Sequence, residues 1–106
     1  MDPTLFYKCL ADETRLKSLL LISLHESLCV CDLVTALELS QPKVSRHLAE
    51  LRHCHLVVSK RKGKWMHYSL SPDLPIWVTE VLSLTASNED FLQKETSRIR
   101  QINKCD

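Results

Sequence analysis

The sequence has very little glycine, the residue that most often interrupts regular structure: one Gly among 106 residues, with four Pro. This scarcity argues against a loop-rich or disordered chain, and the many leucines favour helices. A long apolar segment is also missing, since the longest aliphatic run, residues 19–22, is far too short to cross a bilayer. No basic segment followed by an apolar one opens the chain. At this length we expect a single domain, residues 1–106, in the cytoplasm.

The sequence also lacks the common signatures of small enzymes. It has no Cys-x-x-Cys pair of the kind that thiol reductases use, and no glycine-rich loop that could hold a phosphate. A small thiol enzyme is therefore an alternative that these absences disfavour. We expect a protein without enzymatic activity and without a catalytic cofactor.

Cysteine is present in an odd number, and no export signal accompanies it. In a reducing compartment a disulfide scaffold is disfavoured, so each thiol is either a small buried apolar group or a chemically active one. The five residues are Cys9, Cys29, Cys31, Cys54 and Cys105.

The formal net charge of +1 hides a strongly basic segment. Between residues 41 and 68, Glu50 is the only acidic residue. Four of the five histidines also lie in this segment. A charge run is often no more than a solvated face, but a concentrated basic patch on a nearly neutral chain is typical of a protein that binds a polyanion. The basic side chains of this segment are Lys43, Arg46, Arg52, Lys60, Arg61, Lys62 and Lys64.

Apolar periodicity predicts a mainly helical fold with one β-hairpin. Asp12 and Ser40 are suited to cap helices at their N-termini, Pro42 fits a first helical turn, and Lys62-Gly63 fits a turn between two strands. We expect helices over residues 4–10, 13–25, 28–39, 41–53, 76–84 and 89–102, and strands over 57–61 and 65–70.

The helix over 41–53 has the pattern of a DNA-recognition helix. Val44, Leu48 and Leu51 share its inward face, which leaves the basic and polar side chains outward, and a basic hairpin follows as a wing. We therefore predict a winged helix-turn-helix that binds double-stranded DNA; a winged helix that binds another protein instead is an alternative. The predicted DNA contacts are Gln41, Lys43, Ser45, Arg46, His47, Lys60, Arg61, Lys62 and Lys64.

Cys29 and Cys31 form the second candidate site. Buried cysteines are often simply core residues, but thiols two positions apart on a regular helix point about 200° apart, so both cannot face the core. For the same reason we expect that both could bind one ion only if the first helical turn deforms. A helix N-terminus favours the reactive thiolate, which makes this pair a candidate metal site.

With these motifs in place, the chain resembles the arsenical-resistance repressor (ArsR/SmtB) family of winged helix-turn-helix metalloregulators. The resemblance covers roughly residues 6–77, through LADETRL (10–16), LCVCDL (28–33), SQPKVSRHLAELR (40–52) and KGKWMHYSLSP (62–72). It implies a homodimer built by terminal helices. It also implies repression of a resistance operon, relieved when trivalent arsenic or antimony binds Cys29 and Cys31.

One position departs from the family pattern, because Val34 stands where the family has a third cysteine. Trivalent arsenic favours three thiolates. The third ligand would then be another cysteine of the chain, a small cellular thiol or solvent, or else the inducer differs. A redox or persulfide sensor that uses the same cysteines is the closest alternative function.

Overall fold

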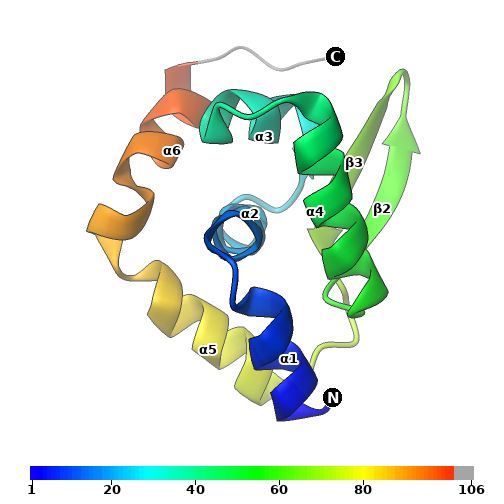
Figure 1. Cartoon of the computed structure of the whole chain (residues 1–106), viewed down its shortest axis with the longest axis vertical. Coiled ribbons are helices and arrows are strands. Elements are labelled where there is room, and N and C mark those ends of the chain that lie inside the picture. The colour runs from blue at the N-terminus through cyan, green and yellow to red at the C-terminus, as the bar shows by residue number, and fades with distance from the viewer. Residues whose placement is uncertain (102–106) are drawn as a thin grey trace.

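The computed structural model describes residues 1–101, which form helices packed around a central helix, with a small antiparallel sheet at one edge (Figure 1). Helix α2 runs through the middle of the view and is surrounded by the other helices, while β2 and β3 project beyond α4. The elements are α1 (Pro3–Leu10), α2 (Glu13–Leu24), β1 (Leu28–Cys29), α3 (Val30–Leu37), α4 (Gln41–His53), β2 (Val57–Lys62), β3 (Trp65–Leu70), α5 (Ile76–Ala86) and α6 (Glu89–Gln101).

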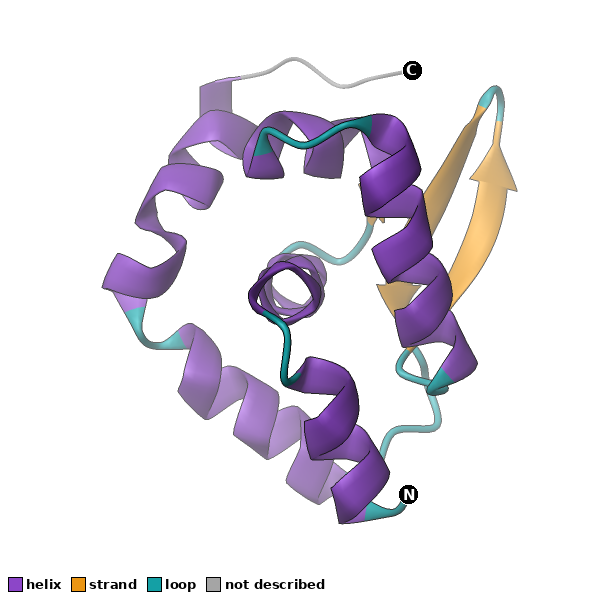
Figure 2. Ribbon diagram, viewed as in Figure 1, coloured by secondary structure: helices purple, strands orange, loops and turns teal. Residues whose placement is uncertain are grey.

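This architecture confirms the predicted fold class, which is mainly α with a β-hairpin wing in a winged helix-turn-helix (Figure 2). Helix α4 has the predicted bounds, β2 is one residue longer than predicted, and α5 continues to Ala86. The predicted end of the last helix, at residue 102, lies outside the described residues.

The predicted helix over residues 28–39 is wrong at both ends. Leu28 and Cys29 form β1, which pairs with Tyr68 and His67 of β3 and makes the sheet order β1-β3-β2. This pairing holds the chain extended, so α3 begins only at Val30. At the other end α3 stops at residue 37, and the next residue takes a left-handed conformation that a helix cannot continue.

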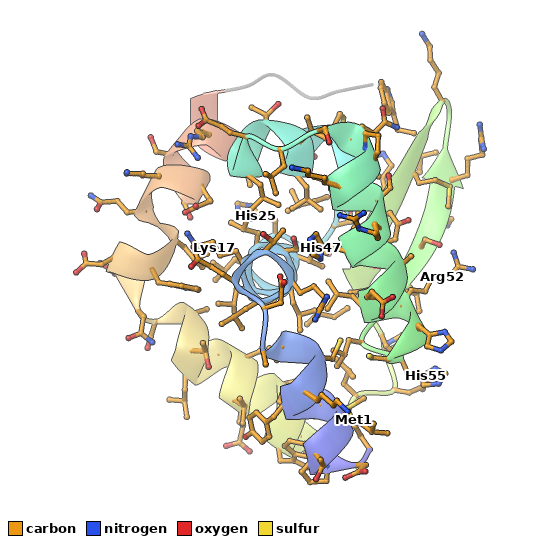
Figure 3. The ribbon with its side chains drawn as sticks, in the orientation of Figure 1. Met1, Lys17, His25, His47, Arg52 and His55 are labelled. Atoms are coloured by element: carbon orange, nitrogen blue, oxygen red, sulfur yellow. A yellow bond between two sulfur atoms is a disulfide. The ribbon has the colours of Figure 1, made fainter. Side chains whose placement is uncertain are left out.

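The core is assembled around α2 and the inward face of α4. Residues 19–22 of α2 are buried, and Val44, Leu48 and Leu51 of α4 are fully inaccessible, as predicted. Lys17 of α2 lies toward α6, where its Nζ is 2.9 Å from Glu95 Oε2 (Figure 3). Among the described residues no helix has the length and apolar character needed to cross a membrane.

Candidate DNA interface and thiol site

The outward face of α4 carries most of the side chains that were predicted to contact DNA. Gln41, Lys43 and Arg46 are exposed, while Ser45 is half-buried. Ser40 occupies the N-cap position in an extended conformation, although its side chain makes no capping hydrogen bond. Because Gln41, Lys43 and Arg46 are exposed, their side chains could reach the edges of bases or phosphate oxygens in a DNA groove.

His47 differs from its neighbours, and its predicted outward position is wrong. Its side chain is 17% exposed, and its Nδ1 lies 3.9 Å from Oδ1 of Asp12 at the start of α2 (Figure 3). The reason is helical spacing: His47 follows the buried Val44 by three positions and so lies at the border of the buried face. It therefore lies between α4 and the start of α2, and its role as a DNA contact stays a prediction.

The hairpin of β2 and β3 carries the second group of basic side chains. Its turn contains Gly63, whose φ of 62° lies in the left-handed region that glycine adopts without strain. Arg52 at the end of α4 reaches across to the hairpin, with its Nη1 3.5 Å from Oγ of Ser59. This contact connects the hairpin to the end of α4. Four exposed basic residues lie at and beside the tip: Lys60, Arg61, Lys62 and Lys64.

Cys29 and Cys31 are brought together at the beginning of α3. Their sulfur atoms are joined in a disulfide; Cys29 is 1% exposed and Cys31 is half-buried. The expectation that the two thiols diverge is wrong because Cys29 is not inside the helix: it is the N-cap, with an extended φ of −84° and ψ of 164°. The two sulfurs can therefore meet while the first turn of α3 stays regular.

Asp32 completes this site, and the sequence analysis missed it. Its N–H donates to Sγ of Cys29 at 3.3 Å, and its Oδ2 accepts from the N–H of Cys29 at 3.1 Å. This reciprocal arrangement is a capping box, and an acidic residue three positions after the cap was the signal available in the sequence. The ligand atoms of Cys29, Cys31 and Asp32 all lie within 4.8 Å of one another, a set that could hold one thiophilic ion.

The other predicted candidates for a third sulfur lie apart from this group. Val34 is half-buried and packs against the core. Cys9 is on α1 and Cys54 directly follows α4. The side chains of these two cysteines contact each other. Cys105 lies outside the described residues. The third potential ligand beside the two sulfurs is thus the carboxylate of Asp32.

Comparison with known proteins agrees with this geometry. The family described as "Bacterial regulatory protein, arsR family" matches residues 12–59. The arsenic resistance transcriptional regulator ArsR1 of Pseudomonas putida is 44% identical over 103 residues, covering 96% of this chain and 80% of the relative. The arsenical resistance operon repressor of Escherichia coli K12 is 54% identical over 80 residues, covering 76% of this chain and 68% of the relative.

Solved structures show the same fold. Reduced HlyU from Vibrio cholerae has a TM-score of 0.71 and 33% identity, covering 79% of this chain and 84% of that one. The AntR antimony-specific transcriptional repressor has a TM-score of 0.65 and 28% identity, covering 86% and 78%. The curated relatives are transcriptional regulators and not enzymes. The chain belongs to the arsR family of winged helix-turn-helix transcriptional regulators.

Proposed function

We propose that this regulator is a metalloid-responsive repressor. It binds operator DNA as a homodimer and dissociates when trivalent arsenic or antimony binds the thiolates of Cys29 and Cys31. The observation that carries the proposal is the position of the two sulfurs at the start of α3, the helix that packs against α4. The names of the relatives, which include arsenic resistance regulators and an antimony-specific repressor, support the same inducers.

The DNA contacts divide into two kinds. Arg46, with Gln41 and Lys43 beside it, lies on the exposed face of α4 and would read base edges in the major groove. The basic tip of the hairpin would neutralise phosphates and so supply affinity that does not depend on sequence. The proposal leaves His47 out of both sets, because its side chain is only 17% exposed and lies toward Asp12.

The dimer contact would form on the outer faces of α1 and α5. These helices lie side by side in Figure 1, and the rings of Phe6 and Trp77 meet edge to face at 5.2 Å between them. Leu5 and Ile76 remain 61% and 75% exposed. Burying such side chains against a second copy would remove apolar surface from water, and it would give the two-fold symmetry that inverted DNA half-sites require.

The proposed switch depends on one sulfur atom that would have two roles. In the reduced protein, each As–S bond to arsenous acid forms as a thiol loses its proton and a hydroxide leaves arsenic, so that water is released. Sγ of Cys29 is also the atom that caps α3 by accepting from Asp32. If the bound ion takes this sulfur out of its capping position, the helix loses a cap, which costs about 0.5–2 kcal/mol. An allosteric coupling of about 1–3 kcal/mol needs an effect of that size.

The coordination sphere has two sulfur ligands from the chain. Asp32 offers an oxygen at the third position, and water or a small cellular thiol would compete with it. A two-sulfur site favours a thiophilic ion over hard cations such as magnesium or calcium, which take oxygen ligands.

A redox or persulfide sensor is the second candidate, and the disulfide between Cys29 and Cys31 favours it. In that case oxidation of the pair would release the operator, and a metalloid would have no effect on reduced protein. The two functions therefore differ in the condition that causes release.

The test is release of labelled DNA from upstream of the gene, followed by fluorescence anisotropy under reducing conditions. Arsenite should release the wild type, whereas Cys29→Ser and Cys31→Ser should bind DNA normally and stay bound. Serine suits the N-cap position as well as cysteine does, so Cys29→Ser should keep α3 intact. Cys54→Ser is the matched control and should respond like the wild type. Release of both variants at wild-type arsenite concentrations would place sensing elsewhere, and release by peroxide alone would favour the redox sensor.

A further inference from the structure

We propose that Cys9 and Cys54 form a second dithiol site, which a peroxide converts into a disulfide joining α1 to the end of α4. This site is separate from the pair at the start of α3, and nothing in the proposed metalloid response requires it.

The two thiols meet across a helix contact. Cys9 lies in the last turn of α1, and its thiol is in hydrogen-bond contact with that of Cys54, the C-cap residue of α4. Sγ of Cys9 is also 4.0 Å from the carbonyl oxygen of Glu50, which accepts the N–H of Cys54 at 3.0 Å. Both cysteines thus lie beside the same backbone carbonyl at the end of α4, although they are far apart in the sequence.

The two sulfurs differ in access. Cys9 is buried at 7% exposure, whereas Cys54 is half-buried. Cys54 lines a groove whose walls come from α1, the end of α4 and β2, and which includes Met1 and His55 (Figure 3). An oxidant that enters this groove reaches Cys54 first.

The chemical environment gives the two thiols different roles. Burial, and next the contact with Cys54, raise the pKa of Cys9 to about 12. Cys9 therefore stays protonated at neutral pH and is protected from direct oxidation, since the thiolate is the reactive form. It can react once its neighbour has been oxidised beside it.

The reaction balances with hydrogen peroxide as the oxidant. The thiolate of Cys54 attacks one peroxide oxygen, the O–O bond breaks, and the hydroxide that leaves takes up the thiol proton to become water. The resulting sulfenic acid is attacked by the sulfur of Cys9, which forms the S–S bond and expels a second hydroxide, and the proton from Cys9 converts this to water. Two thiols and one peroxide thus give one disulfide and two waters.

A metal site is a weaker assignment for the same pair. Among the described side chains, the one group of three or more ligand-type residues is that of Cys29, Cys31 and Asp32. Tetrahedral ions such as zinc take four protein ligands in structural sites. A pair of sulfurs without a third ligand beside it is better suited to forming a disulfide.

Because the two thiols are neighbours at the contact of α1 with the end of α4, the disulfide should form with little movement of either helix. The oxidised protein should therefore keep its affinity for operator DNA. It should also unfold at a higher temperature, because the cross-link closes a long loop and restricts the unfolded chain.

The test uses full-length protein carrying Cys29→Ser, Cys31→Ser and Cys105→Ser, which leaves Cys9 and Cys54 as its two thiols. Hydrogen peroxide should remove both thiols together, and peptide mapping should find Cys9 linked to Cys54 within one chain. The melting temperature should rise and return to its starting value after reduction. The matched control adds Cys54→Ser and should lose no thiol, because Cys9 alone is buried and protonated.

Three results would overturn the proposal. One is sulfinic acid at Cys54 with Cys9 still a free thiol, which would show that the two do not react. Another is a cross-link between two chains in place of one within a chain. The third is loss of the Cys9 thiol in the control. The sensor cysteines are absent from this protein, so each result is independent of whether the metalloid response is correct.

Discussion

The guanidinium of Arg98 in α6 donates to the backbone carbonyl oxygen of Ala36 in α3, with 2.8 Å between Nη1 and the oxygen. Its Nη2 lies 3.2 Å from Oε1 of Glu38, the residue with a left-handed φ of 55° that ends α3. The last carbonyls of a helix have no partner inside it, so Arg98 supplies one from outside. Helix α3 is therefore held at its start by the capping box of Cys29 and at its end by α6.

Replacing Arg98 by alanine should destabilise the turn between α3 and α4. We expect the free energy of unfolding to fall by about 1–2 kcal/mol, since a hydrogen bond from a charged donor and a partly exposed ion pair are lost. Urea unfolding measures the change. Lys94→Ala, an exposed position on the same helix, is the control and should change stability by less than about 0.5 kcal/mol. Equal effects of the two substitutions would show that Arg98 does not hold the turn.

The basic patch should make DNA binding strongly dependent on salt. If it forms about 6–10 phosphate contacts, affinity should fall by orders of magnitude between about 50 and 200 mM salt. Lys62→Ala and Lys64→Ala should weaken binding to all sequences alike and flatten the salt slope. Arg46→Ala should instead reduce discrimination at one base position, by about 1–3 kcal/mol. Wing variants with unchanged affinity and slope would contradict the proposed contact between hairpin and phosphate.

Acid should destabilise the start of α2 through Asp12. The carboxylate accepts the N–H of Arg15 at 2.9 Å, and this bond, more than the nearby His47, holds the pKa of Asp12 below its ordinary value of 3.8. Because the folded-state pKa is the lower one, the stabilisation is present at neutral pH and is lost as the pH falls through the folded-state pKa.

Urea unfolding at a series of pH values checks this prediction. Asp12→Ala should cost about 1 kcal/mol at neutral pH through loss of the cap. Asp12→Asn keeps a capping side chain without a charge, so its stability should fall less steeply than that of the wild type below about pH 4. Parallel curves for the wild type and Asp12→Asn would show that this carboxylate does not contribute to acid sensitivity.

The proposed dimer contact can be tested at two exposed apolar positions. Leu5→Glu on α1 and Ile76→Glu on α5 should shift the protein toward a monomeric mass in light scattering, because burying an unpaired carboxylate at an interface is costly. Leu24→Glu is the control, since Leu24 is also 52% exposed but lies at the end of α2. A monomeric wild type at micromolar concentration would rule the contact out.

The sequence predicted best where local pattern and tertiary packing agree. Helix α4 was bounded correctly by Ser40 and by its buried Val44, Leu48 and Leu51, and the hairpin was found through alternation and its glycine turn. The sequence-based prediction of a helix failed for Leu28–Cys29. These residues pair with β3, a distant segment, and local periodicity carries no signal of that pairing.

At the candidate site, too, the sequence predicted local features but not contacts between distant segments. The importance of Cys29 and Cys31 could be predicted from their spacing and the family resemblance, but their meeting could not, because it depends on Cys29 acting as a cap. Helical spacing places His47 at the border of the buried face, but the sequence does not show that the start of α2, with Asp12, covers it. The contact between Cys9 and Cys54 joins distant parts of the chain and has no local signal in the sequence.

The most direct test of the proposed switch is to measure arsenite affinity of the reduced protein with and without saturating operator DNA. If the ion that binds Cys29 and Cys31 drives release, linkage requires DNA to weaken arsenite binding by the same factor as arsenite weakens DNA binding. We predict one common factor in the range of about 5–150-fold. An arsenite affinity that is the same with and without DNA would show that the site at the start of α3 is not coupled to DNA binding.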